Sequence, residues 1–334
     1  MSDSQKVGTT TFLILWRQPL VFVISAGWGS VWGVRMALQI AQGRECHIVT
    51  RPSNRMEVLL PEIAELNVRL RNEHPNARLW SLAASEDDAA LVRALGVGAI
   101  WATITAFVDE RLYFPELEQP KIYDAVHTAR TDSFKRHELA HGVNNLALIT
   151  YTIFGSTDSV AQVARAYRGL RYVNYTNEGG LKMLDAAGIR RVLSRSRCGL
   201  LLSATEGANN ATVEYFLCGL PLVTTPSHGG REEMYDPRHA TVVEPSASAV
   251  EEAVAAYQKT APDPFEVRGA VLAKARPHRA RLIAWLSEVA GRDLLPLADG
   301  NLWLPQFHDK LRQVWRIDAR PDGRWDARRE IVPE

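Results

Sequence analysis

Short apolar runs alternate along this chain with longer segments in which apolar residues recur every three or four positions. The apolar runs predict buried strands, the clearest being Leu20–Ser25, Cys46–Thr50, Gly98–Thr105, Asn145–Thr150 and Gly199–Ser203. The periodic segments predict amphipathic helices, such as Val31–Gln42, Leu60–Glu73 and Arg276–Val289. Strands that alternate with helices predict parallel sheets with right-handed crossovers, so we expect an α/β fold.

The chain has 334 residues, which is enough for two domains of ordinary size. Proline and polar residues interrupt the pattern between Tyr113 and Pro120, as is typical of a connection between domains. We therefore expect a short N-terminal Rossmann-like domain at 1–118, a second Rossmann-like domain at 119–290 and a C-terminal tail at 291–334.

The segment from Cys198 to Glu233 holds the densest chemistry. A predicted strand ends at Ser203, a polar loop follows it, and a helix is expected over Ala211–Cys218 before the next strand. The loop carries Glu206 at the carboxyl end of a strand, where open α/β sheets bind ligands, and the helix carries Glu214. Backbone N–H groups at the start of this helix form a ready anion site, contributed by Gly207, Ala208, Asn209, Asn210 and Ala211. Two carboxylates beside an anion site suit a ligand with hydroxyl groups and a phosphate, such as a nucleotide sugar.

The same segment carries four linked sequence elements, which are Glu206-Gly207, Glu214, the run Cys218-Gly219-Leu220-Pro221-Leu222-Val223, and Gly229-Gly230 followed by Glu233. This pattern resembles the signature of retaining GT-B glycosyltransferases of group 1, the family 4-like enzymes. The resemblance implies two Rossmann-like domains facing across a cleft, with a C-terminal helix that crosses back to the first domain. We expect that helix at Phe307–Ile317.

The resemblance also implies roles for particular residues. Arg130 and Lys135 follow a predicted strand at Lys121–Ala129 with the spacing that opens the family's donor domain. They are expected to hold the donor diphosphate in place of a metal, since no D-x-D motif stands at a strand end. Glu206 is expected to accept hydrogen bonds from the donor sugar, Glu214 from the ribose, and Tyr175 is expected to lie near the base.

The glycines of the turn at Ala26–Ser30 offer a second candidate site. Gly27, Gly29 and Gly33 resemble a dinucleotide fingerprint, but their spacing is one residue too long. The second strand ends in Thr50-Arg51 instead of an acidic residue, so NAD binding is not favoured. The family resemblance implies instead that Gly27 and Gly29 belong to a cleft loop near the acceptor.

The composition of the chain limits the binding partners and the cellular location that we expect. A net charge of +1 gives no nucleic-acid footprint. The three cysteines, Cys46, Cys198 and Cys218, have no metal-ligand spacing, and their odd number suits a reducing compartment. The apolar patch at Thr11–Trp16 is too short for a signal peptide or a membrane span. We expect a cytoplasmic protein, with peripheral membrane contact and the oligomeric state left open.

We therefore predict a retaining, metal-independent glycosyltransferase of the hexosyltransferase type. Its donor is a nucleoside-diphosphate sugar, with a UDP-sugar as the first candidate, and its acceptor is a small-molecule, glycan or lipid-linked hydroxyl group. Two alternatives stay open. A nucleotide-sugar epimerase of the same fold would need no acceptor, and a non-catalytic subunit would bind the nucleotide sugar without turnover.

Overall fold

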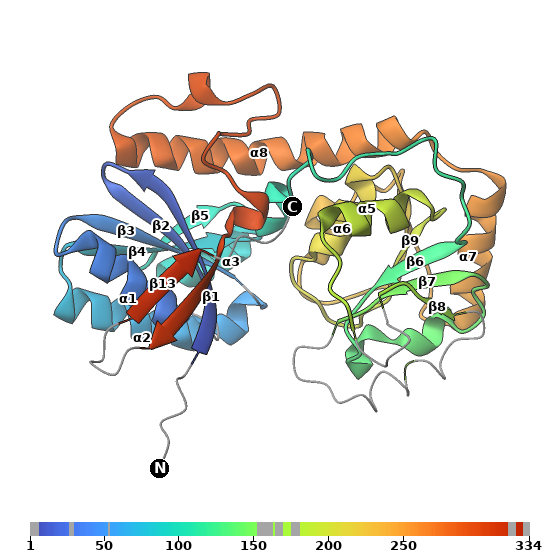
Figure 1. Ribbon diagram of the computed structural model, residues 1–334, viewed down its shortest axis with the longest axis horizontal. Coiled ribbons are helices and arrows are strands. Elements are labelled where there is room, and N and C mark those ends of the chain that lie inside the picture. Colours follow the sequence, from blue (N-terminus) through green and yellow to red (C-terminus); the bar gives the residue numbers. More distant parts are fainter. Residues whose placement is uncertain are drawn as a thin grey trace, which may run out of the picture. The chain divides into compact units, whose positions relative to one another are not determined.

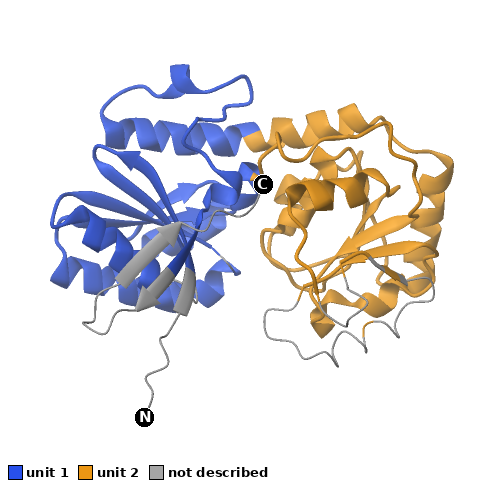
Figure 2. Cartoon of the chain, viewed as in Figure 1, with its two compact units in different colours: residues 1–107, 276–334 blue, residues 108–275 orange. Residues whose placement is uncertain are grey.

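The computed structural model describes residues 7–26, 30–52, 54–151, 163, 170–174, 181–319 and 325–329. The chain divides into two compact units (Figure 2). Unit 1 combines Met1–Phe107 with Arg276–Glu334, and unit 2 is the continuous segment Val108–Ala275. Each unit contains its own sheet, so the predicted α/β class with two Rossmann-like bodies is confirmed.

Unit 1 is built on a seven-stranded sheet in the order β13-β12-β1-β2-β3-β4-β5. Its parallel part consists of β2 (Leu20–Ser25), β3 (Cys46–Arg51), β4 (Ala77–Ala83) and β5 (Gly98–Trp101). The crossovers between these strands are α1 (Ser30–Ala41), α2 (Met56–Glu73) and α3 (Glu86–Ala94). Because the strands follow one another in order, the right-handed crossovers all cover the same face of the sheet.

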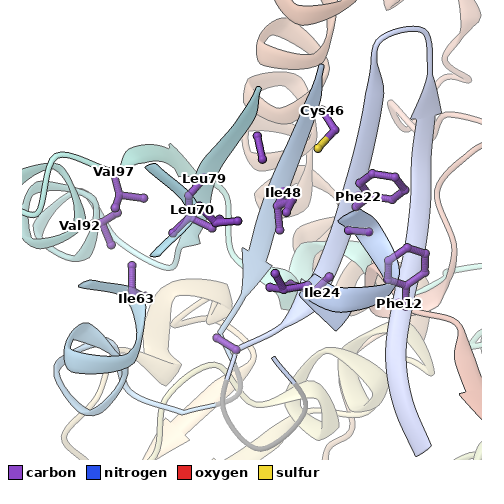
Figure 3. Packing of buried hydrophobic residues seen from close by; sticks show 14 of the residues in the cluster. Phe12, Phe22, Ile24, Cys46, Ile48, Ile63, Leu70, Leu79, Val92 and Val97 are labelled. Atoms are coloured by element: carbon purple, nitrogen blue, oxygen red, sulfur yellow. The ribbon is translucent and has the colours of Figure 1, made fainter. Parts of the chain in front are cut away.

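The core of unit 1 lies between the sheet and these three helices (Figure 3). Strand residues Phe22, Ile48 and Leu79 pack there with Ile63 and Leu70 of α2, all at most 7% exposed. Burying a side chain of this size contributes about 1.5–3 kcal/mol. The face is apolar because alternate strand residues point to it, while their neighbours point to the opposite face.

The part of the long helix α8 (Pro264–Ala290) that belongs to unit 1 packs on the opposite face of this sheet (Figure 1). Trp285 meets Trp80 with ring centroids 5.1 Å apart and His47 with ring centroids 6.2 Å apart. Trp80 Nε1 donates a hydrogen bond to His47 Nδ1 at 3.0 Å. The helix contributes residues to both units, because unit 2 ends at Ala275 and unit 1 resumes at Arg276.

Three antiparallel strands extend the sheet of unit 1, namely β1 (Val7–Arg17), β12 (Val314–Ala319) and β13 (Trp325–Arg329). The helix predicted at Phe307–Ile317 is therefore wrong, because only a short 3-10 turn at Asp309–Leu311 precedes β12. The edge of β1 explains the difference. Trp315 Nε1 donates to the Phe12 carbonyl at 2.9 Å and its ring meets the Phe12 ring edge-on, so pairing overrides the local helical pattern.

Unit 2 has a six-stranded parallel sheet in the order β11-β10-β9-β6-β7-β8. The strands are β6 (Ala125–Thr128), β7 (Leu146–Ile149), β8 (Leu170–Tyr172), β9 (Gly199–Leu201), β10 (Leu222–Thr224) and β11 (Ala240–Val242). The described helices include α5 (Ala186–Ser194), α6 (Asn210–Leu217) and α7 (Ala247–Lys259). The chain builds outward from β6 to β8, then returns to the other side of β6 and builds outward again. This reversal creates a topological switch point between β6 and β9, where sheets of this kind bind ligands at the carboxyl edge.

The three cysteines, Cys46, Cys198 and Cys218, are free and buried. Within the described part of the chain, none of the helices combines the length and the apolar character needed to cross a bilayer.

Candidate functional site

Three loops meet at the carboxyl edge of the unit 2 sheet, beside the switch point. The first follows β6 and carries Arg130 and Lys135, and the second follows β9 and carries Glu206. The Ala204 N–H donates to the Phe134 carbonyl at 3.1 Å, which joins the first loop to the second. The third loop follows β10 and is joined to the second, since the Glu206 N–H donates to the His228 carbonyl at 2.8 Å. Residues far apart in the sequence are therefore fixed side by side.

Lys135 and Glu206 form an ion pair across the first two loops, from Lys135 Nζ to Glu206 Oε1. Only 6% of the lysine side chain and 14% of the glutamate side chain are exposed. The second carboxylate oxygen, Glu206 Oε2, is buried and has no hydrogen-bond partner among the residues that the structure describes. A buried acceptor without a donor is costly, so this oxygen is suited to receive a hydroxyl group from a ligand.

Arg130 lies near Lys135 but is more exposed. Its Nε is 2.9 Å from Asp132 Oδ2, and 32% of its side chain is accessible to solvent. Arg130 and Lys135 both approach the ring of Phe134, at 5.6 and 5.2 Å from its centroid. The first loop thus presents one buried and one accessible cation at the switch point.

Two buried histidines support this loop from below. His127 lies on β6 and His137 follows the loop, with ring centroids 5.0 Å apart. A ring nitrogen of His137, Nε2, lies 2.7 Å from the Arg130 carbonyl oxygen, which fixes the backbone next to the cation. Burial lowers the pKa of both imidazoles, most strongly that of His127. Both rings are therefore neutral near pH 7, and they position the loop without adding charge to it.

Two arginines that the sequence analysis missed hold the strand ends together. Arg136 adopts a left-handed conformation with φ of 50°, and its side chain donates to the Leu202 carbonyl at 2.5 Å and to Thr225 Oγ1 at 2.6 Å. Arg231 is 2% exposed and donates to the Ser203 carbonyl at 2.9 Å and to the Thr225 carbonyl. Carbonyl groups at the ends of buried strands need donors once the ladder stops. Arg231 lies between Gly230 and Glu233 of the sequence signature, but nothing local in the sequence shows which carbonyl groups it would bind.

Helix α6 begins directly after the Glu206 loop. Asn209 caps it, because its side-chain oxygen accepts the Thr212 N–H at 3.2 Å. Within the described ranges, no acceptor receives the N–H groups of Gly207, Ala208, Asn210 or Ala211. The helix start predicted at Ala211 is observed one residue earlier, and its free N–H groups keep the expected capacity for an anion.

The next turn of α6 carries Glu214, which is 5% exposed. Its neighbour Tyr215 accepts a hydrogen bond from the Thr128 N–H through its phenolic oxygen at 2.7 Å. The Tyr215 ring also packs against Gly199 of β9, where a side chain would collide with it. These contacts fix α6 against β6 and β9, and therefore fix the separation of Glu214 from the loops.

Tyr175, Gly27 and Gly29, which the sequence analysis also proposed as site residues, lie outside the described residues. In the parts of the chain that the structure describes, no group of three or more histidine, cysteine, aspartate or glutamate side chains is arranged to hold a metal ion.

Comparison with known proteins relates this chain to a family and to solved structures. Residues 137–259 match the family model described as "Glycosyl transferases group 1". The segment includes Glu206, Glu214 and Arg231 and begins two residues after Lys135. None of the curated proteins compared with the chain matches it in sequence.

The solved structures share the fold at low sequence identity. The chain resembles HepE from Anabaena in complex with UDP and glucose, with a TM-score of 0.53 and 17% identity over 79% of this chain and 77% of that chain. The same protein in complex with UDP-glucose gives a TM-score of 0.51 and 16% identity over 80% and 78%. TarM gives a TM-score of 0.51 and 13% identity over 77% of this chain and 57% of that chain.

Proposed function

Because the chain carries a glycosyl transferases group 1 domain on a GT-B fold, we propose that it transfers a sugar from a nucleoside-diphosphate sugar to a hydroxyl acceptor. We further propose that the donor is a UDP-sugar, that the anomeric configuration is retained and that no metal takes part. The structurally similar HepE was solved with UDP-glucose, which supports UDP as the first nucleotide to test.

The observation that carries the proposal is the pairing of Lys135 with Glu206 at the switch point, beside Arg130. When the nucleoside diphosphate leaves, negative charge grows on its phosphate oxygens. Fixed cations stabilise this charge without reorganising at the moment of reaction. In this assignment Lys135 and Arg130 bind the diphosphate, and the N–H groups at the start of α6, which follows the Glu206 loop, add further donors.

The glutamates take the hydroxyl groups of the donor in this proposal. Glu206 Oε2, buried and without a partner among the described residues, accepts a hydrogen bond from a sugar hydroxyl. Glu214, buried on α6, accepts from the ribose. The bond from the anomeric carbon to the phosphate oxygen breaks, and the acceptor oxygen forms a bond to that carbon on the same face. The acceptor proton passes to the departing phosphate oxygen, so the products are a glycoside and a nucleoside diphosphate.

Calorimetric titration with UDP, GDP, ADP and their common sugar conjugates, with and without EDTA, tests the donor site. We expect one nucleotide series to bind, with an affinity that EDTA leaves unchanged and that Lys135→Met reduces. Lys121→Met is the matched control, because Lys121 also belongs to unit 2 but donates to the Ser194 carbonyl, before β6 begins. Failure of every nucleotide to bind, or equal loss in both variants, would refute the donor assignment.

Product analysis then separates the proposal from its alternatives. An epimerase would release a free epimer or free nucleotide when the donor is incubated alone, and a binding subunit would bind the donor without any turnover. A transferase consumes the donor only with an acceptor, which a screen of glycans, small alcohols and lipid-linked sugars can supply. Proton NMR of the first glycoside formed reports the anomeric configuration, and an inverted product would refute retention.

A further inference from the structure

A second charged cluster lies in unit 1, at the carboxyl edge of its own sheet. Arg51 is the last residue of β3 and lies opposite Ser25, the last residue of β2. The turn that precedes β12 brings Asp309 and Arg312 to the same cluster, since both act electrostatically on Arg51. None of these residues has a role in the site of unit 2.

Arg51 is buried but poorly compensated. The residue is only 7% exposed, although a guanidinium carries five N–H donors. Its Nη2 donates to Ser25 Oγ at 3.3 Å, near the upper limit for a hydrogen bond. Its Nε is buried and has no partner among the described residues. A buried charge normally has a counter-ion and a full set of hydrogen-bond acceptors. The described residues do not supply that set to Arg51, so an external ligand could complete it.

The surrounding charges increase the imbalance. Asp309 favours the charged form of Arg51, but its Oδ2 also lies 3.2 Å from Lys310 Nζ. Arg312 is exposed and opposes the charge on Arg51. Burial is the main cause, and repulsion by Arg312 the second, of the lowering of the pKa of Arg51 to about 10. Arg51 is therefore attracted by a carboxylate that also pairs with Lys310, and it is repelled by Arg312.

We propose that Arg51 and Arg312 bind an oxyanion at the carboxyl ends of β2 and β3. A guanidinium presents its donors in a planar fork that fits phosphate or carboxylate, and an anion between two guanidiniums converts their repulsion into attraction. The position agrees with the rule that parallel sheets bind ligands beyond the carboxyl ends of their strands. The assignment of the oxyanion to the acceptor rests on the proposed function. The acceptor is then an anionic molecule.

Thermal unfolding of the whole chain in inorganic phosphate tests the site. Chloride keeps the ionic strength constant, and saturating UDP occupies the donor site of unit 2. A ligand that binds only the folded state raises the melting temperature with its concentration. We expect phosphate to do so for the unmodified protein and Arg312→Gln to weaken the apparent phosphate affinity about tenfold or more.

Matched variants make the result decisive. Arg78→Gln removes an arginine whose side chain is 67% exposed at the start of β4, and it should respond to phosphate as the unmodified protein does. Arg51→Met should lose the phosphate response while keeping its stability in phosphate-free buffer, because it removes an uncompensated buried charge. If Arg51→Met does not fold, the comparison of Arg312→Gln with Arg78→Gln alone tests the proposed oxyanion site. An equal phosphate response in Arg312→Gln and Arg78→Gln would overturn the proposal.

Two further arms separate this inference from the proposed function and identify the source of the anion. Lys135→Met should lose nucleotide affinity, and Arg312→Gln should keep it, so the two sites fail independently. Cosedimentation with phosphatidylcholine vesicles, with and without phosphatidylglycerol, distinguishes a lipid headgroup from a soluble anion. If the protein binds anionic vesicles and Arg312→Gln abolishes this binding, the acceptor is a lipid. If phosphate raises the melting temperature but the vesicles do not bind, the acceptor is a soluble anion. Vesicle binding that is independent of Arg312, without a phosphate response, would contradict the site.

Discussion

Lys135→Met is the substitution that most directly tests the site of unit 2. It replaces a side chain of similar length and removes the only positive charge paired with Glu206 in the described residues. Breaking a buried ion pair by removing one partner costs about 3–5 kcal/mol of unfolding free energy, because the other charge stays buried. Glu206 is 14% exposed, so we expect a loss near the lower value, about 3 kcal/mol.

The same substitution should weaken donor binding. If Lys135 contributes a charge-assisted hydrogen bond to the diphosphate, its loss costs about 1.5–3 kcal/mol. This corresponds to a Kd for the nucleotide that is about 10- to 150-fold higher. Urea unfolding gives the stability change and calorimetry gives the Kd, both at the same pH and salt concentration.

A double-mutant cycle with Glu206→Gln separates the pair from its surroundings. Glu206→Gln alone leaves Lys135 buried without a carboxylate, whereas Lys135→Met with Glu206→Gln leaves no unpaired charge. We expect the double variant to be more stable than the sum of the single losses predicts, by about 0.5–3 kcal/mol. Additive losses would refute the ion pair, and an unchanged nucleotide Kd in Lys135→Met would refute the diphosphate role. Lys121→Met controls for the loss of a positive charge. It should leave the nucleotide Kd unchanged, and its stability loss should be additive with that of Glu206→Gln.

Substitutions at three further residues test the contacts that support the site. Tyr215→Phe leaves the half-buried Thr128 N–H without its acceptor and should cost about 1–3 kcal/mol in urea unfolding, whereas a loss below the experimental error would show that another acceptor replaces it. Asn209→Ala removes the cap of α6 and should cost about 1 kcal/mol, while Asn209→Asp keeps the acceptor and should cost less. The lowered pKa of His127 means that the unfolded chain binds a proton first as the pH falls below 6.5, so stability decreases from there until the folded pKa is reached. His127→Gln should therefore flatten the loss of stability between about pH 7 and pH 5, and an unchanged slope would contradict the assignment.

Local signals in the sequence predicted the strands and the helix that carry the unit 2 site. The run from Cys198 to Thr225 gave β9, α6 and β10 to within a residue or two, because a buried strand, an asparagine cap and a Gly219 stop each act over a few positions. The predicted resemblance to group 1 glycosyltransferases is confirmed by the family match over residues 137–259, and the predicted GT-B fold by the solved structures. The roles of Arg130, Lys135, Glu206 and Glu214 stay predictions.

Contacts between distant residues could not be predicted. The sequence analysis gave Lys135 and Glu206 separate ligands, and their direct pairing follows only from the return of the chain to β9. Arg136 and Arg231 look like ordinary surface arginines in the sequence, because nothing local shows which carbonyl groups lack partners. The same limit produced the wrong helix at Phe307–Ile317, since the strand there depends on an edge that lies some 300 residues earlier.

That pairing has a consequence for synthesis on the ribosome. Trp315 bonds to Phe12 across 303 residues, so the edge of β1 has no β12 to cover it until the ribosome has reached β12. Unit 2 is a continuous segment and can fold as soon as it emerges, while unit 1 waits half-assembled with an open strand edge. Such an edge is a template for pairing with other chains. The nascent protein is therefore most exposed to aggregation through β1, and slow translation should lengthen that exposure.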